Sequence, residues 1–213
     1  MEITWYGHSC FRIAERNRVT IITDPYSDDL GLGSLKLKGD VVTISHDSPS
    51  HNHVSAVKSD VYTLRGPGEY EIGNVFIIGL PLHNTQNGAA NPNVAYHYQY
   101  ENLSVLHLGD LAHLPEQSVI EGLGTVNVLL VPVGGGNGLK AAQAAEVVAM
   151  IEPHYIIPMH YALHGLQIEL DSVDKFLTAM GVSKTVESDA LKITVSDLPE
   201  QPQVVVLNPQ IGK

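Results

Sequence analysis

Short apolar runs fill the first 135 residues of the chain, and their length and spacing restrict the folds open to it. The runs are rich in Val, Ile and Tyr and are bounded by Gly, Pro, Asn or Asp, a pattern typical of β-strands joined by turns. Both residues of Gly73-Asn74 tolerate positive φ, which predicts a tight hairpin. We expect strands at Ile3–Tyr6, Cys10–Ala14, Val19–Thr23, Val41–Ile44, Val61–Leu64, Glu69–Ile72, Val75–Leu82, Val94–Tyr100 and Ser104–Leu108.

The remaining residues alternate between helical and strand patterns. No internal repeat, low-complexity tract or long linker divides the chain, so we expect one domain over residues 1–213. Many strands followed by alternating helices and strands predict an α+β fold, with two mixed sheets and helices on their outer faces. The later elements are expected as helices at Pro115–Leu123, Leu139–Ile151 and Asp171–Met180, and strands at Asn127–Val133, Tyr155–Pro158, Leu191–Val195 and Val204–Leu207.

The composition narrows the class of partner. With 12 Lys and Arg against 23 Asp and Glu, the formal net charge is -11, which disfavours nucleic-acid backbones and anionic membrane surfaces. No apolar run approaches the roughly 20 residues of a membrane helix, and the first twenty residues lack a signal-peptide pattern. A single cysteine, Cys10, forms no intrachain disulfide. We therefore expect a cytoplasmic protein that acts on a small molecule, with its oligomeric state left open.

Four of the apolar runs finish on a residue able to bind a metal ion. The run after Val41 ends at His46, and the later runs end at His83, Asp110 and His160. Strand ends at one sheet edge meet in space although they lie far apart in sequence, and imidazole and carboxylate groups on rigid strands suit a zinc-type site. A lone histidine after a strand is more often a surface or hydrogen-bonded residue, but this interpretation must explain each of the four separately.

The segment Ser45–His53 (SHDSPSHNH) is the most informative stretch. It places three histidines within nine residues directly after an apolar strand, and Pro49 forces a turn between them. A polar surface loop is the alternative interpretation, but it does not account for the strongly apolar strand that leads into the segment.

Thr43–His51 resembles the metal-binding signature His-x-His-x-Asp-His of the metallo-β-lactamase superfamily. The resemblance is to its subgroup of small metal-dependent hydrolases, which contains the ascorbate-phosphate lactonase. It implies a four-layer α/β/β/α sandwich with a metal site at one edge of the two sheets. Further matches occur in the same order from about residue 2 to residue 161: ITWYGHSCFRI, ITDP, GPGEYEIGNVFIIGLPLH, HLGDLAH, PVGGG and IIPMHY.

The resemblance also implies the metal ligands. His46 and His83 match ligands of a first metal, His51 and His160 match ligands of a second, and Asp110 matches the carboxylate that bridges both.

Two positions depart from the family signature. Ser48 and Ser50 stand where the family has its second histidine and its aspartate. Because a serine hydroxyl is a poor ligand for a divalent ion, we expect one ion rather than two, with zinc favoured and manganese or iron as alternatives. Asp47 and His53 are candidate substitutes for the lost ligands.

These features predict a metal-dependent hydrolase in which a metal-bound hydroxide attacks an ester, lactone, amide or phosphodiester. Asp110 and His8 are the candidate catalytic residues; the resemblance places His8 near the site, whereas a hydrogen-bonded turn histidine is the alternative. Asp24 either orients a ligand histidine or starts the Asp24-Pro25 turn, and His107 is expected to be packed. Two other functions stay open. One is a catalytically weakened member that binds a ligand or partner, and the other is a metal-free lyase or isomerase.

Overall fold

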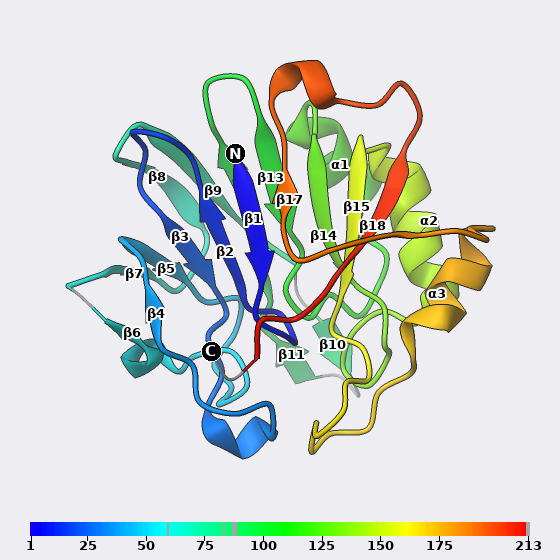
Figure 1. The fold of residues 1–213 in the computed structure, drawn as a ribbon, viewed down its shortest axis with the longest axis horizontal. Helices are drawn as coiled ribbons and strands as arrows, with labels where there is room; N and C mark the ends of the chain where they lie inside the picture. Colours follow the sequence, from blue (N-terminus) through cyan, green and yellow to red (C-terminus); the bar gives the residue numbers. More distant parts are fainter. Residues whose placement is uncertain (59, 83, 87–88, 212–213) are drawn as a thin grey trace.

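The chain folds into two mixed β-sheets that pack face to face (Figure 1). The computed structural model describes residues 1–58, 60–82, 84–86 and 89–211. The main hydrophobic core fills the space between the sheets and continues beneath the helices. The expected α+β sandwich is therefore confirmed, and most elements lie within one or two residues of their predicted bounds.

The six-stranded sheet supplies one half of the sandwich. In chain order, its first three strands β1, β2 and β3 form an antiparallel meander, and β3, β5 and β7 run parallel. The carboxyl ends of β3 and β5 therefore lie at the same edge of this sheet. In spatial order the strands are β17 (Leu191–Lys192), β1 (Glu2–Trp5), β2 (Phe11–Ala14), β3 (Ile21–Thr23), β5 (Val41–Thr43) and β7 (Tyr62–Leu64).

The eight-stranded sheet combines a parallel and an antiparallel part. From β16 to β13 neighbouring strands are parallel, and from β13 to β8 they are antiparallel. Gly73 and Asn74 both have positive φ, which confirms the predicted hairpin turn. In spatial order the strands are β16 (Val186–Ser188), β18 (Gln203–Leu207), β15 (Tyr155–Met159), β14 (Val128–Pro132), β13 (Ser104–His107), β12 (Val94–Gln99), β9 (Val75–Pro81) and β8 (Gly68–Ile72).

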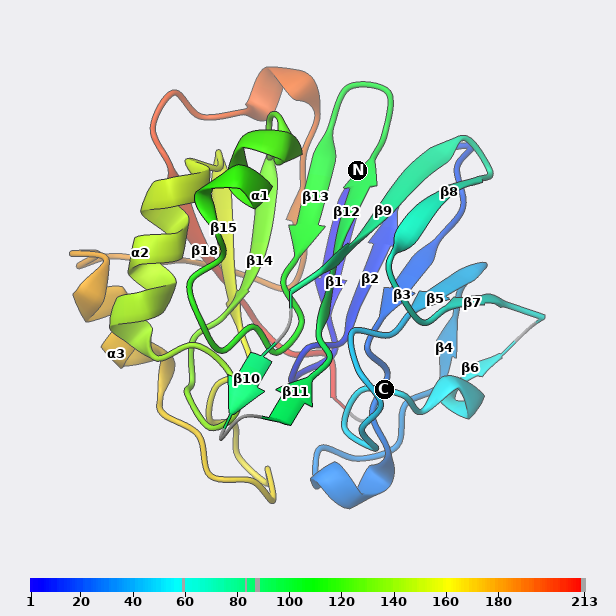
Figure 2. The same ribbon diagram turned by 180° about the vertical axis from the view of Figure 1, so that it is seen from behind.

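The outer faces of the two sheets are covered differently. Helices α1 (Gln117–Leu123) and α2 (Ala141–Ile151) lie over the eight-stranded sheet, and α3 (Val173–Ala179) packs beside α2 (Figure 2). On the outer face of the six-stranded sheet, a second apolar cluster is covered by short segments. Among the described residues, these segments contain no α-helix. That cover consists of the 3-10 turns η1 (Asp28–Leu30) and η2 (Val54–Ala56) and the paired strands β4 (Leu37–Lys38) and β6 (Val57–Lys58).

Buried tyrosines of β12 tie the two sheets together. The Tyr98 hydroxyl lies 2.6 Å from Thr43 Oγ1 on β5, and the Tyr96 hydroxyl lies 3.2 Å from the Ile44 carbonyl oxygen. Hydrogen bonds in such a dry core are strong and directional. They fix β5 against β12 and thereby set the position of the loop that follows β5.

The remaining elements are short. They are the hairpin of β10 (Asn84–Gln86) and β11 (Ala89–Asn91) and the 3-10 turn η3 (Val195–Asp197). Across the described part of the chain, no helix combines the length and the apolar character needed to cross a bilayer.

Candidate metal centre

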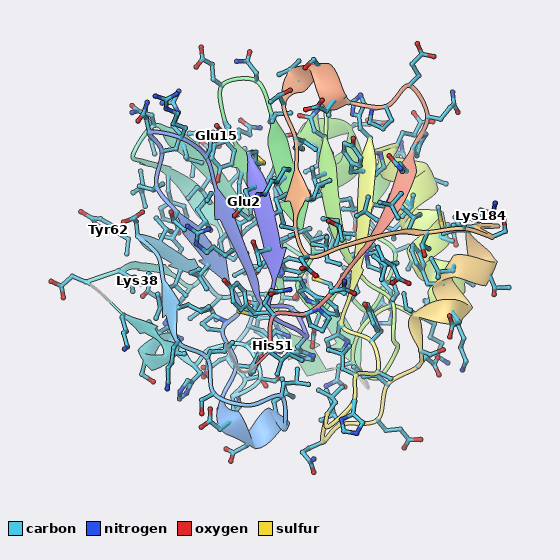
Figure 3. All side chains as sticks on the ribbon, in the orientation of Figure 1. Glu2, Glu15, Lys38, His51, Tyr62 and Lys184 are labelled. Atoms are coloured by element: carbon cyan, nitrogen blue, oxygen red, sulfur yellow. The ribbon has the colours of Figure 1, made fainter. Side chains whose placement is uncertain are left out.

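Polar residues from four separate segments meet at one edge of the sandwich. His46 and His51 lie in the loop after β5, Asp110 follows β13, and His160 follows β15 directly. His8 lies in the turn between β1 and β2. The labelled His51 marks this edge in Figure 3. The parallel strands β13 and β15 place their carboxyl ends at one edge of the eight-stranded sheet. The packing of β5 against β12 brings the loop after β5 to the same edge.

Asp110 is the centre of the cluster. Its Oδ1 lies 3.0 Å from His51 Nε2 and 3.1 Å from His160 Nε2, while Oδ2 lies 3.7 Å from His46 Nε2. The side chain is almost fully buried. One carboxylate oxygen thus contacts His51 and His160, while the other faces His46.

His8 belongs to the same cluster. Its ring centroid lies 4.3 Å from that of His160 and 4.7 Å from that of His51. Ligand atoms of His8, His51, Asp110 and His160 all lie within 4.8 Å of one another, and all four residues are buried. The sequence predicted His8 beside the site, and the structure places it among the donors themselves.

The two serines at the departing signature positions contact one another and His51. Ser50 Oγ lies 2.8 Å from His51 Nδ1 and 2.9 Å from Ser48 Oγ. Ser50 thus contacts the ring nitrogen that faces away from Asp110, so it orients the histidine instead of offering a ligand.

Two other predicted residues lie elsewhere. His53 Nε2 contacts Ser55 Oγ at 3.2 Å, and Asp47 accepts a hydrogen bond from Asn52 on the surface. Neither belongs to the group of converging donors. His83 lies outside the described residues.

Buried hydrogen bonds that run from Asp24 through Ser45 position His46. Ser45 donates its backbone N–H to Asp24 Oδ1 and its hydroxyl to Asp24 Oδ2, both at 2.7 Å. Ser45 Oγ also lies 3.0 Å from His46 Nδ1. Of the two functions predicted for Asp24, this geometry favours orientation of a histidine, here through Ser45.

The loop that carries Asp110 is held by Asn93, which sequence patterns did not single out, and by His107. Asn93 Oδ1 accepts a hydrogen bond from the Asp110 N–H at 2.9 Å, and Asn93 Nδ2 donates to the Leu108 carbonyl at 3.0 Å. His107 Nδ1 accepts from the Gly109 N–H at 3.2 Å, which leaves its Nε2 to donate to the Ser9 carbonyl at 3.0 Å. His107 is therefore packed, as predicted, and its bonds fix the turn before Asp110.

The electrostatics of the cluster favour a bound cation. Burial alone raises the pKa of Asp110, but His160 and His51 together hold that pKa well below its usual value. Burial, followed by the neighbouring His160 and His51, lowers the pKa of His8 far below the ordinary value, and burial also lowers the pKa of His46. Burial would lower the pKa of His51, but the Asp110 carboxylate raises it above its ordinary value. The cluster thus offers an anionic carboxylate surrounded by imidazoles, the ligand types that a divalent ion binds.

Unpartnered nitrogens provide a direct test of whether these residues fit a metal. Both ring nitrogens of His8, and Nδ1 of His160, are buried without a hydrogen-bond partner among the described residues. Buried polar atoms are nearly always satisfied by protein, water or an ion. The donor set therefore fits a divalent ion.

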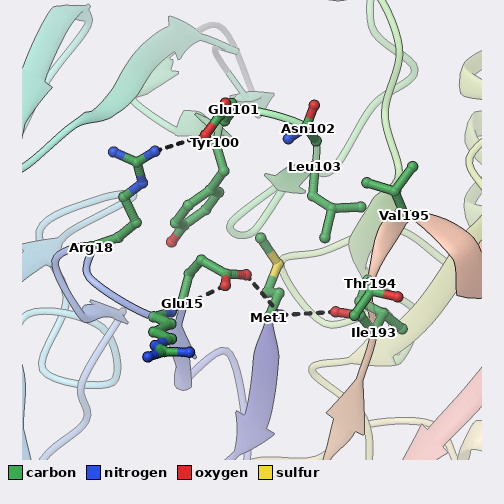
Figure 4. A pocket seen from close by; sticks show the side chains of 11 residues that line it. Met1, Glu15, Arg18, Tyr100, Glu101, Asn102, Leu103, Ile193, Thr194 and Val195 are labelled. Carbon is green, nitrogen blue, oxygen red and sulfur yellow. Dashed lines mark hydrogen bonds and ion pairs between the residues drawn. The ribbon is translucent and has the colours of Figure 1, made fainter.

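A separate pocket of about 230 Å³ lies at the opposite end of the sandwich (Figure 4). The positions of Glu15 and His51 in Figure 3 show this separation. Four of the pocket's charged groups form pairs, since Glu15 contacts the Met1 amino group at 2.7 Å and Arg18 contacts Glu101 at 3.1 Å. This pocket therefore lacks the converging imidazole and carboxylate donors of the metal centre.

Comparisons with known proteins agree with this geometry. A protein family described as "Beta-lactamase superfamily domain" matches residues 2–160. A UPF0173 protein of Pyrococcus furiosus is 30% identical over 188 residues, covering 78% of this chain and 85% of that protein. A UPF0173 metal-dependent hydrolase of Thermococcus kodakarensis is 24% identical, and the match covers 76% of this chain and 84% of that protein.

A solved structure from Thermotoga maritima, assigned to the metallo-beta-lactamase superfamily, has a TM-score of 0.79 to this chain. It is 32% identical, and the match covers 97% of both chains. The family match reaches from before His8 to His160 and so includes every donor of the cluster.

Proposed function

The chain belongs to the beta-lactamase superfamily domain family and has the metallo-β-lactamase fold, and we propose that it is a hydrolase whose single divalent ion is held by His51, Asp110 and His160. The observation that carries this proposal is the convergence of buried donors on Asp110 Oδ1. Relatives named metal-dependent hydrolases support the reaction class.

We infer a single ion from the two departing signature positions. Ser48 and Ser50 offer hydroxyls, which are poor ligands for a divalent ion, and Ser50 instead contacts His51 Nδ1 at 2.8 Å. The donor set of imidazole and carboxylate suits zinc best, and manganese or iron next.

The surrounding residues would prepare the site for hydrolysis. The ion would supply an acidified water and polarise the scissile carbonyl or phosphoryl group. Ser50 holds the Nδ1 side of His51 and so directs Nε2 at the centre. His46 is more exposed than His51 or His160, and its Nε2 is placed to take up a proton beside the carboxylate.

A surface cleft of about 370 Å³ next to His160 is the candidate substrate site. A Cβ at Gly138, which lines the cleft, would lie 3.5 Å from His160 Nδ1. Lys140 and Gln143 also line it, so it offers a cationic and an amide group. We propose that a small ester, lactone, amide or phosphodiester binds here, with a polar or anionic end toward Lys140.

The test combines metal content with activity. Protein purified without chelator is analysed for zinc, manganese and iron per chain, and assayed on a panel of esters, lactones and phosphodiesters. We expect about one equivalent of metal, and metal-dependent hydrolysis that Asp110→Ala reduces by at least about 100-fold. His164→Ala, which changes an exposed histidine, serves as the control.

The outcomes separate the competing functions. Metal binding without turnover on any substrate would favour the ligand-binding protein. That alternative is suggested by Ser48 and Ser50, which replace two ligands of the family signature. No metal at any supplied concentration would rule out the hydrolase.

A further inference from the structure

His8 is held in the cluster by its backbone. Its φ is 52°, in the left-handed region that L-residues rarely adopt. Its carbonyl oxygen accepts hydrogen bonds from Trp5 Nε1 at 3.0 Å and from the His160 N–H at 3.1 Å. These bonds pin the residue, so the position of its ring is set by the fold rather than by solvent.

The His8 side chain, by contrast, forms no hydrogen bond with the residues that the structure describes. Both ring nitrogens are buried without a partner among the described residues, and the residue is 1% exposed. A buried imidazole with no partner is costly. A strained backbone that delivers an unsatisfied ring to a cluster of donors is typical of a functional constraint.

The position of His8 matches the ligand that the cluster lacks. The signature aspartate is replaced by Ser50, whose hydroxyl contacts the far side of His51. The His8 ring, in turn, lies tilted against both His51 and His160, and its donor lies within 4.8 Å of theirs and of the Asp110 carboxylate. Shifts of about an ångström would bring the four donors to the separations of a shared coordination shell.

We propose that His8 is a fourth protein ligand of the metal ion, which makes this chain's centre a mononuclear site of three histidines and one aspartate. This inference rests on the proposed function, because it concerns the same ion. Four protein ligands leave a position open to substrate only if the ion takes five or more ligands. The site should therefore favour ions that readily do so.

The test detects the metal–nitrogen bonds directly. The full chain is labelled with ¹⁵N in its histidine rings and loaded with ¹¹³Cd²⁺ as a probe of zinc-type sites. A ring nitrogen bonded to the ion then shows scalar coupling to it. We expect three coupled histidines, and two in His8→Asn, whose asparagine tolerates left-handed backbone. The His8→Asn variant should also bind Cd²⁺ at least about 100-fold more weakly.

Controls separate a ligand from a structural residue. Without metal, His8→Asn should still unfold cooperatively in urea, because the ring makes no hydrogen bond to the described residues that the fold would lose. His164→Ala should keep all three couplings. If His8→Asn does not fold, assignment of the wild-type ring signals through the backbone answers the question alone.

The failures are distinguishable. Coupling to His51 and His160 but not to His8, or three couplings that persist in His8→Asn, would overturn this inference and leave the proposed hydrolase intact. An absence of coupling in the wild type together with no metal bound would overturn both.

Discussion

Three polar residues around the metal centre hold a backbone conformation that L-residues disfavour. His8, Asp24 and His160 have φ of 52°, 38° and 52°. Such strain persists only where surrounding contacts determine it, and it concentrates at functional sites. Here the contacts are the bond from the His160 N–H to the His8 carbonyl and the bond from the Asp24 N–H to the Thr43 carbonyl. The strained backbone at the candidate site therefore lowers the free energy of unfolding.

The serine at the missing aspartate position offers a first prediction. Ser50→Ala removes the hydroxyl 2.8 Å from His51 Nδ1. We expect metal affinity to fall about 10-fold, because a partner behind a ligand histidine fixes its orientation. Competition with a chromophoric chelator measures the change. Ser55→Ala is the matched control, since it removes a serine contact to His53 in the same segment; equal affinities of the two variants would contradict the assigned function of Ser50.

Gly109 gives a second prediction. Its φ is 59°, and a Cβ there would lie 2.4 Å from Asn93 Oδ1 and 2.5 Å from Ser45 Cβ. Gly109→Ala should lower the free energy of unfolding by about 2 kcal/mol or more, through backbone strain and displacement of both neighbours. Urea titration of the metal-free protein measures this.

A matched glycine lies in α1. A Cβ at Gly122 meets nothing within 4 Å, so Gly122→Ala should stabilise the helix by about 0.5–1 kcal/mol. If Gly109→Ala were as stable as the wild type or gained stability as Gly122→Ala does, the tight packing inferred at Gly109 would be wrong.

At the scale of elements, β12 carries a buried histidine with a predictable pH response. His97 pairs with Ile78 and Leu106 on the adjacent strands, and burial lowers its pKa to about 4. In the unfolded chain the pKa returns to about 6.5. The neutral ring therefore favours the fold fully above about pH 6.5, and this contribution, about 3 kcal/mol in total, is lost as the pH falls toward 4.

His97→Leu should remove this acid sensitivity. In the presence of chelator, we expect the wild type to lose more of its unfolding free energy between pH 7 and pH 5 than the variant does. Urea unfolding at both pH values measures the difference, with His164→Ala as the exposed control. Parallel losses in the wild type and His97→Leu would show that other groups govern the acid response.

The elements that could be predicted from sequence are those whose pattern is local. The Gly73-Asn74 turn and the apolar strands ending near His46, Asp110 and His160 required only short-range rules. Strands β4 and β6 could not be found in this way, because each has two residues and exists only through pairing with the other across the chain. Asn93 was missed for the same reason, since its function depends on a turn 17 residues away.

On the scale of the whole molecule, the donors of the centre come from both sheets. His8 and His51 follow strands of the six-stranded sheet, whereas Asp110 and His160 follow strands of the eight-stranded sheet. A bound ion would therefore crosslink the sandwich. At 100 times its dissociation constant, zinc should stabilise the fold by about 2.7 kcal/mol.

Thermal unfolding with zinc and with chelator checks this prediction. The melting temperature should rise with zinc in the wild type and in His164→Ala, and remain constant in Asp110→Ala. A rise of equal size in Asp110→Ala would mean that zinc binds elsewhere.

The hydrogen bond from the His160 N–H to the His8 carbonyl also has a consequence for biosynthesis. A ribosome adds His160 about 150 residues after His8, which takes roughly 8–30 s at common rates of translation. Until then the nascent chain contains His8 but lacks the His160 N–H that fixes the His8 carbonyl. Metal loading must therefore follow synthesis of most of the chain, and a polypeptide stalled before β15 would emerge without a metal site.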